Sequence, residues 1–234
     1  MTPDEWLRLL SQHPLIAVIR VTDTLLGKRM ARVAAAAGIR LIEITWNSAD
    51  AARSIAALRQ ELPHCLIGTG TVLDSVMLSD AIAAGAQFVF SPHTDVELIH
   101  VAAQQKIPIV PGALTPTEIV TAWNAGAYSV KVFPISTMGG AAYIRSLQGP
   151  LGHIPLIPTG GITAQSAKDC LDAGAIAVGM SSHLFPTSLI EKGRWDIATQ
   201  QAASLVAALT HKMPGLVTSF DKPIRLPTIP GKML

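Results

Sequence analysis

Short apolar runs rich in Val and Ile recur about every 20 residues along this chain, and Ala-rich segments with helical spacing separate them. Parallel strands that are buried on both faces give such runs, because helices cover both sides of the sheet. Eight runs can be counted: Leu15 to Arg20, Leu41 to Thr45, Leu66 to Thr69, Phe88 to Ser91, Ile107 to Gly112, Ser129 to Phe133, Leu156 to Thr159 and Ala175 to Met180. The pattern predicts eight alternating strands and helices.

Glycines, prolines and helix-capping residues between the runs indicate where helices begin and end. The clearest start is Thr115-Pro116-Thr117-Glu118, which has a capping hydroxyl, a Pro at the first helical position and a Glu three residues after the cap. Four other segments end in Gly or near Pro, as helices do: Met30 to Gly38, Ala49 to Leu62, Ser75 to Gly85 and Ala164 to Gly174.

Eight units in 234 residues favour an α/β fold that is a single (β/α)8 TIM barrel, which typically needs about 250 residues. A doubly wound open sheet has the same alternation and stays the alternative. Met1 to Gln12 predicts an extra N-terminal helix over the bottom of the barrel, and Arg194 to Lys212 the last outer helix. We expect a barrel domain over residues 1–213 and an extended Pro-rich C-terminal tail over residues 214–234, where prolines interrupt every periodicity.

Composition excludes several classes of protein. Although 49% of the residues are hydrophobic, no uninterrupted apolar run approaches the roughly 20 residues that span a bilayer. Asp4, Glu5 and Arg8 break up the apolar region that a secretory signal requires, so we expect a cytoplasmic protein without a membrane partner. A net charge of +2 without a basic stripe argues against nucleic acid as a partner, and we expect Cys65 and Cys170 to be reduced.

Two charged side chains lie inside predicted strands. Lys131 is the only strand lysine and Glu43 the only strand carboxylate, and the alternation of side chains along a strand points both into the barrel. A buried ion pair that fixes the strand register is one interpretation. Catalysis is the other, because reactive groups of such barrels gather at the carboxyl ends of the strands and desolvation favours the neutral amine that attacks a ketone.

Glycines and hydroxyls collect after the third, seventh and eighth predicted strands. Barrels commonly bind phosphate with the loops that follow strands seven and eight, where free backbone N–H groups face an anion. Pro158 to Gly161 and Gly179 to Ser182 therefore predict a phosphate subsite made of Gly160, Gly161, Gly179, Ser181 and Ser182. A Gly-rich turn into a helix capped by Thr163 is the alternative. No histidines or cysteines have metal-ligand spacing, so no metal or cofactor is expected.

These residues together resemble the KDPG/KHG aldolase family from about Leu15 to Pro186. The motifs that carry the resemblance are Glu43-Ile44-Thr45, Gly68 to Val72, Ser91-Pro92-His93, Pro111-Gly112, Thr115 to Glu118, Lys131 to Pro134, Pro158 to Gly161 and Gly179 to Ser182. The resemblance implies a metal-free class I aldolase, usually a homotrimer, that cleaves 2-dehydro-3-deoxy-6-phosphogluconate to pyruvate and glyceraldehyde 3-phosphate. It implies that Lys131 forms the Schiff base, that Glu43 moves protons, and that Thr71, Pro92, Phe133 and Thr159 contact substrate.

The chain departs from the family at one position. Asn47 stands where the gluconate-type enzymes carry an Arg that pairs with the pyruvyl carboxylate. Asn47-Ser48 resembles galactonate-type relatives, whereas Thr159 resembles the gluconate type. Arg20 closes the first predicted strand beside the strand of Glu43, and we expect it to bind the carboxylate in place of the missing Arg, with Asn47 nearby. A salt bridge from Arg20 to Asp23 or Glu43 is the alternative.

Three substrates stay open: the phosphogluconate type, the phosphogalactonate type and 4-hydroxy-2-oxoglutarate, which would give pyruvate and glyoxylate. An isomerase or synthase for another phosphorylated metabolite is the second function class, since many barrels share the same phosphate loops. Such an enzyme needs no amine on a strand. A barrel that only binds a partner is the third class, and it would tolerate the loss of Lys131.

Overall fold

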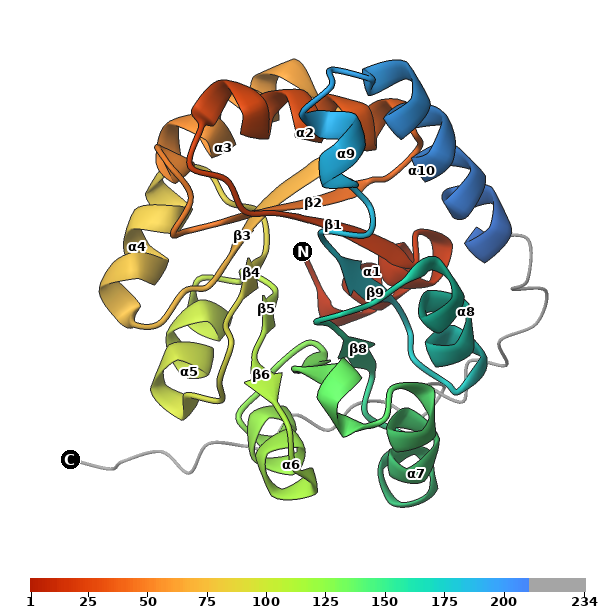
Figure 1. Cartoon of the computed structure of the whole chain (residues 1–234). Coiled ribbons are helices and arrows are strands. Elements are labelled where there is room, and N and C mark those ends of the chain that lie inside the picture. The colour runs from red at the N-terminus through yellow and green to blue at the C-terminus, as the bar shows by residue number, and fades with distance from the viewer. Residues whose placement is uncertain (211–234) are drawn as a thin grey trace.

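The computed structural model describes residues 1–210 and has an α/β fold in which parallel strands lie inside a circle of helices (Figure 1). Its strands are β1 Leu15–Ile19, β2 Leu41–Thr45, β3 Leu66–Gly70, β4 Val89–Phe90, β5 Ile109–Val110, β6 Gly112–Ala113, β7 Val130–Val132, β8 Leu156–Pro158 and β9 Val178–Met180. Its helices are α1 Pro3–Gln12, α2 Thr24–Ala36, α3 Ala51–Glu61, α4 Ser75–Ala83, α5 Val96–Gln104, α6 Pro116–Asn124, the 3-10 helix η1 Ile135–Met138, α7 Ala141–Leu151, α8 Ala164–Asp172, α9 Thr187–Ile190 and α10 Trp195–Thr210.

The strands form two parallel sheets that adjoin at two places. The larger has the order β5-β4-β3-β2-β1-β9 and the smaller the order β6-β7-β8. β5 and β6 follow one another along the chain, with Pro111 between them. At the other junction, Thr159 forms a bridge with Gly179, and the Ile176 N–H donates to the Leu156 carbonyl at 3.0 Å.

One predicted strand is wrong as a single element. The run Ile107 to Gly112 becomes two short strands that belong to different sheets, β5 and β6. Pro111 has no N–H with which to continue a ladder, although its carbonyl still accepts from Lys131 N–H at 2.9 Å. The other predicted strands are found with ends that differ by a few residues, as assignments commonly do.

Helix starts follow the local sequence. The predicted capping box is confirmed: Thr115 Oγ1 accepts from the Glu118 N–H, and a Glu118 carboxylate oxygen accepts from the Thr115 N–H at 2.7 Å. A second capping box, formed by Thr2 and Glu5, begins α1. No described helix is long and apolar enough to cross a membrane. The predicted tail, residues 214–234, lies outside the described residues.

Two groups of buried side chains make up the core. The larger group fills the space between the strands and the surrounding helices. The smaller group packs α1 against the strands and includes Trp6 and Leu10 of α1 together with Phe88 and Phe90. Trp6 is fully buried, and its indole N–H donates to Ser129 Oγ at 3.0 Å. Because Ser129 immediately precedes β7, α1 packs at the amino-terminal end of the strands.

An aromatic column rises from α1 through this smaller group. The ring centroids of Trp6 and Phe88 are 5.6 Å apart, and those of Phe88 and Phe90 are 5.8 Å apart and nearly perpendicular. Lys131 Nζ lies 5.9 Å from the Phe90 centroid. The column therefore runs from the amino-terminal end of the strands up to the level of Lys131.

Removal of the Trp6 side chain tests how much this column stabilises the fold. We expect Trp6→Ala to lower the free energy of unfolding by about 3–5 kcal/mol, because it leaves a cavity and removes the partner of the Ser129 hydroxyl. Leu25→Ala is the control, since Leu25 is 78% exposed and should change stability by no more than about 0.5 kcal/mol. Urea unfolding followed by circular dichroism measures both, and equal stabilities would contradict the role of Trp6.

Candidate active site

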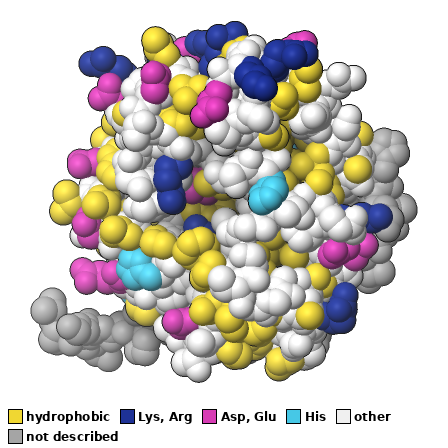
Figure 2. All heavy atoms as spheres, viewed as in Figure 1, with side chains coloured by type: hydrophobic (Ala, Val, Ile, Leu, Met, Phe, Trp, Pro, Cys, Tyr) yellow, Lys and Arg dark blue, Asp and Glu magenta, His cyan; other side chains and the backbone are white. Residues whose placement is uncertain are grey.

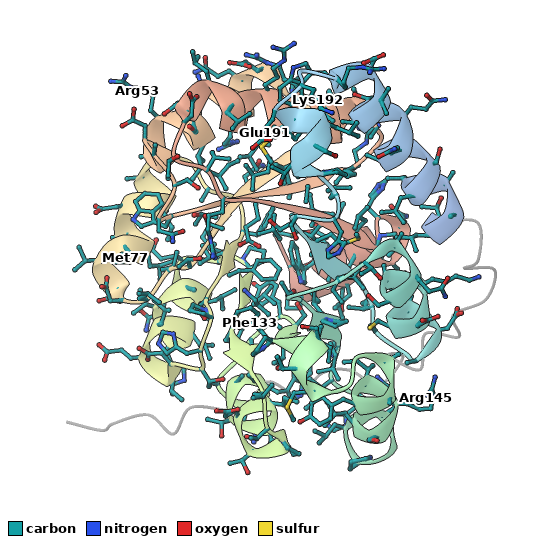
Figure 3. The ribbon with its side chains drawn as sticks, viewed as in Figure 1. Arg53, Met77, Phe133, Arg145, Glu191 and Lys192 are labelled. Atoms are coloured by element: carbon teal, nitrogen blue, oxygen red, sulfur yellow. The ribbon has the colours of Figure 1, made fainter. Side chains whose placement is uncertain are left out.

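A cavity of about 220 Å³ opens among the carboxyl ends of the strands and the loops that follow them. Its lining residues are Val18, Arg20, Glu43, Thr71, Pro92, Lys131, Phe133, Thr159, Gly160, Gly161, Ile162, Gly179, Ser181 and Ser182. Phe133 lies near the centre of the molecule, whereas Arg53, Met77 and Arg145 lie on the outer helices (Figure 3). Figure 2 shows that most charged side chains on this face lie toward its rim. The cavity therefore gathers almost all of the site residues that the sequence predicted.

Lys131 projects into this cavity from β7. The residue is 7% exposed, and Nζ lies 4.6 Å from the centroid of the Phe133 ring. Burial lowers the pKa of Lys131 below its ordinary value, nearby Glu43 opposes this shift, and the positive charge of Arg20 adds to it. The environment thus favours the neutral amine, the form that is nucleophilic.

Glu43 lies in the same cavity wall on β2. It is 2% exposed, and burial raises the pKa of its carboxyl group, while the charges of Lys131 and Arg20 oppose that shift. Gly70, at the end of the adjacent strand β3, makes room for it, because a Cβ at position 70 would overlap the Glu43 carboxyl group. The carboxyl group is therefore nearly buried and packs closely against Gly70.

Lys131 and Glu43 share the cavity without forming an ion pair. The ion pairs within residues 1–210 join Glu61 to Lys28 and to Arg32 on the outer surface, so the Lys131 and Glu43 charges lie more than 4.0 Å apart. A register-fixing salt bridge is therefore not what holds them. Burial shifts the pKa of each group toward its neutral form, and the space between them belongs to the cavity.

Arg20 follows β1 at the rim of the cavity and is exposed. Its guanidinium group donates to Thr71 Oγ1 at 3.4 Å, and within the described chain it forms no ion pair with Asp23 or Glu43, contrary to the alternative considered from the sequence. Thr71 has a φ of 61°, which is uncommon for a β-branched residue. Arg20 therefore adds a positive charge to the cavity lining, in contact with Thr71.

Uncharged donors line the part of the cavity that the loops after β8 and β9 form, and these two strands pair with β7 and β1. Gly160 and Gly161 follow β8 with φ values of 94° and 71°, and Ser181 and Ser182 follow β9. The backbone N–H groups of Gly161, Ser181 and Ser182 donate no hydrogen bond to the rest of the described chain. Free N–H groups and hydroxyls that converge in this way can hold an anion.

Asn47 is the one predicted site residue outside the cavity lining. It lies exposed in the turn after β2, and the neighbouring Ser48 is buried, with its hydroxyl bonded to Thr45 and to the backbone of Val21. The structure adds Val18 and Ile162 to the lining. Val18 pairs with Glu43 in the strand register and could have been found from the same alternation. Within residues 1–210, no cluster of His, Cys, Asp or Glu is arranged to hold a metal ion.

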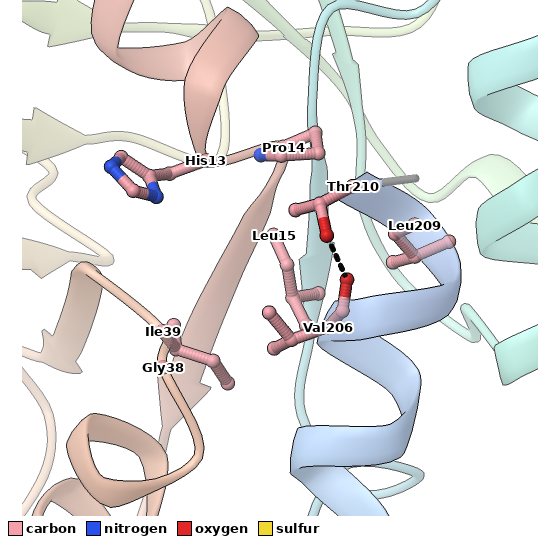
Figure 4. A pocket seen from close by; sticks show the side chains of 8 residues that line it. All are labelled: His13, Pro14, Leu15, Gly38, Ile39, Val206, Leu209 and Thr210. Carbon is pink, nitrogen blue, oxygen red and sulfur yellow. Dashed lines mark hydrogen bonds between the residues drawn. The ribbon is translucent and has the colours of Figure 1, made fainter. Parts of the chain in front are cut away.

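A second cavity lies on the other side of the fold, between the start of β1 and α10 (Figure 4). It has a volume of about 10 Å³, enough for about one water molecule, and its lining includes Leu15, Ile39 and Val206. The nearby Thr210 hydroxyl already donates to the Val206 carbonyl at 2.9 Å. This small apolar space offers no room for a metabolite.

The comparisons with known proteins agree on one family. Residues 7–201 match the family described as KDPG and KHG aldolase. The chain is 32% identical over 203 residues to the 2-dehydro-3-deoxy-phosphogluconate aldolase of Dickeya dadantii, covering 87% of this chain and 95% of that one. It is 31% identical over 198 residues to the KHG/KDPG aldolase of Escherichia coli, covering 85% and 93%.

A solved structure is similar over the same region. The KDPG aldolase of Legionella pneumophila, with pyruvate captured at low pH as a covalent carbinolamine intermediate, superposes with a TM-score of 0.79 at 27% identity. The match covers 88% of this chain and 98% of that one.

Charge removal at Glu43 tests the electrostatic coupling in the cavity. Because the Glu43 carboxylate raises the pKa of Lys131, Glu43→Gln should lower that pKa further, so that Lys131 reacts with an amine-specific acylating reagent at lower pH. Mass spectrometry of Lys131 labelling across a pH series gives the midpoint. Glu61→Gln, which changes a surface ion pair, should leave the midpoint unchanged. An upward shift in Glu43→Gln would contradict the coupling.

Proposed function

Because the chain belongs to the KDPG and KHG aldolase family, we propose that it cleaves 2-dehydro-3-deoxy-6-phosphogluconate to pyruvate and glyceraldehyde 3-phosphate through a Schiff base on Lys131. Family membership makes the chain a lyase of the class I aldolase type. The observation that carries the residue assignment is a buried amine with a lowered pKa in one cavity with a buried carboxyl group whose pKa is raised.

In this mechanism the neutral Lys131 amine attacks the C2 ketone and gives a carbinolamine. Loss of water yields a protonated imine, which accepts the electron pair when the C3–C4 bond breaks. The aldehyde leaves as the C4 hydroxyl gives up its proton, and an enamine remains on Lys131. Protonation at C3 and addition of water then release pyruvate and restore the amine.

Glu43 is the proton carrier in this scheme. It accepts the C4 hydroxyl proton, directly or through a water, and its raised pKa suits a group that must both take up and return protons. Positioned acid–base help of this kind typically contributes about 10² to 10⁴ in rate.

Substrate binding is assigned to the rest of the cavity lining. Arg20 and Thr71 hold the pyruvyl carboxylate, and Pro92, Phe133 and Thr159 flank the reacting carbons. Gly160, Gly161, Gly179, Ser181 and Ser182 bind the phosphate through neutral donors. We assign Asn47 a substrate contact only at the rim, because it does not line the cavity.

The proposal includes the architecture and the assembly. We infer that the two sheets complete one (β/α)8 barrel within residues 1–213, with α1 as the added helix at its amino-terminal end; the junctions at Pro111 and at Thr159–Gly179 support this. We further propose a cytoplasmic homotrimer, as expected from the family resemblance, and we assign it no metal or cofactor.

A pyruvate-release assay tests the proposed activity. We expect the protein to act on 2-dehydro-3-deoxy-6-phosphogluconate, measured beside its galactonate epimer and 4-hydroxy-2-oxoglutarate with lactate dehydrogenase as the coupling enzyme. Lys131→Arg should fold and release no pyruvate, because a permanently charged guanidinium has no free lone pair. Lys28→Arg, on the surface beside Glu61, should keep full activity. Activity in Lys131→Arg would overturn the mechanism.

Arg20 has its own test. Arg20→Ala should raise KM for every pyruvyl substrate by roughly 10- to 100-fold, since a hydrogen bond to a charged group contributes about 1.5–3 kcal/mol. Arg145→Ala, which removes an exposed arginine from α7, should leave KM unchanged. An unchanged KM for pyruvate in the condensation direction would show that backbone donors hold the carboxylate without Arg20.

A further inference from the structure

The loop after β7 approaches the anion-binding end of the cavity. Two hydrogen bonds tie this loop to the loop after β8: Ile135 N–H donates to the Thr159 carbonyl at 3.0 Å, and Ser136 N–H donates to the Gly160 carbonyl at 3.3 Å. These bonds continue the β7–β8 pairing beyond the strands, whose last pair is Val132 with Pro158. The first turn of η1 is therefore held in register with the glycines that line the cavity.

The Ser136 side chain lies against Gly161. A Cβ built on Gly161 would lie 2.6 Å from Ser136 Cβ and closer still to its hydroxyl oxygen. Gly161 itself lines the cavity with a φ of 71°. Any side chain at position 161 would therefore displace the Ser136 hydroxyl, so the glycine keeps the space in which that hydroxyl lies.

The Ser136 hydroxyl is exposed and makes no hydrogen bond within residues 1–210. The adjacent hydroxyl differs, because Thr137 Oγ1 donates to the Pro134 carbonyl at 2.9 Å. The Thr137 hydroxyl is thus bonded within its own loop, whereas the Ser136 hydroxyl is unbonded and lies beside Gly161, which lines the cavity.

The charges of the lining residues show why a further hydrogen-bond donor matters near the loops after β8 and β9. The cavity-lining residues contributed by the loops after β8 and β9 are all uncharged. The two lining cations come from other elements: Arg20 follows β1, and Lys131 lies in β7. The donors that these two loops offer to a phosphate are therefore neutral, and the charge of the acceptor strengthens each of them.

We propose that Ser136 is a specificity-determining residue whose hydroxyl donates to the phosphate of the substrate, beside Gly161 and the serines after β9. The inference rests on the proposed function and deepens it. It assigns the loop after β7 a role in selecting phosphorylated over unphosphorylated 2-keto-4-hydroxy acids, in addition to carrying Phe133.

The test compares Ser136→Ala with the matched control Thr137→Ala on two substrates. Ser136→Ala should raise KM for 2-dehydro-3-deoxy-6-phosphogluconate about tenfold with kcat unchanged, as expected when one hydrogen bond to a charged group is lost from ground state and transition state alike. KM for 4-hydroxy-2-oxoglutarate should not change. Thr137→Ala should leave both constants within about twofold, because its hydroxyl is already bonded within the loop.

A second variant and a second ligand make the outcome decisive. Ser136→Asp should raise KM for the phosphorylated substrate more than Ser136→Ala does, because a carboxylate repels the phosphate, and both variants should weaken competitive inhibition by inorganic phosphate. Equal changes for both substrates, or no change in Ser136→Ala while the parent enzyme works normally, would overturn the role of Ser136 and leave the proposed function intact. A parent enzyme that releases no pyruvate from the phosphorylated substrate would overturn both.

Discussion

The burial of Lys131 and Glu43 away from bulk solvent is the constraint on which the site depends. Each group is almost fully buried, they face one cavity, and they are too far apart to neutralise one another as an ion pair. Desolvation is the largest cause for each group: it lowers the pKa of the amine and raises that of the carboxyl group, while the attraction between the two groups opposes both shifts. Burial thus shifts each pKa toward the neutral form of its group, and for Lys131 that form is the free amine that attacks a ketone.

The surrounding structure maintains that environment. The column of Trp6, Phe88 and Phe90 packs inside the strands below the amine, and Lys131 Nζ lies 5.9 Å from the Phe90 centroid. Gly70 leaves space for the Glu43 carboxyl group. Arg20 is exposed at the rim, where its charge disfavours protonation of Lys131 and can attract a carboxylate. Packing below the site and charge at its rim therefore act on the same amine.

Local patterns predicted the elements and most of the site. The alternation of side chains along the strands was enough to predict that Lys131 and Glu43 face one cavity. The capping residues predicted the start of α6. The sequence could not predict contacts between distant segments. The division of the fifth strand at Pro111 depends on pairing with two different neighbours, and the position of Asn47 outside the lining depends on how the turn after β2 folds. No sequence pattern pointed to Ser136 as a site residue, because its contact with Gly161 appears only in the folded structure.

The most direct measurement of the central claim is borohydride reduction in the presence of pyruvate, followed by peptide mass spectrometry. An imine between Lys131 and pyruvate can be reduced irreversibly, whereas a pyruvate molecule that is only bound cannot be captured in this way. The account predicts one added reduced pyruvyl group on Lys131 and none on the Lys131→Arg variant. A label on a different lysine, or no label in a protein that releases pyruvate, would contradict it.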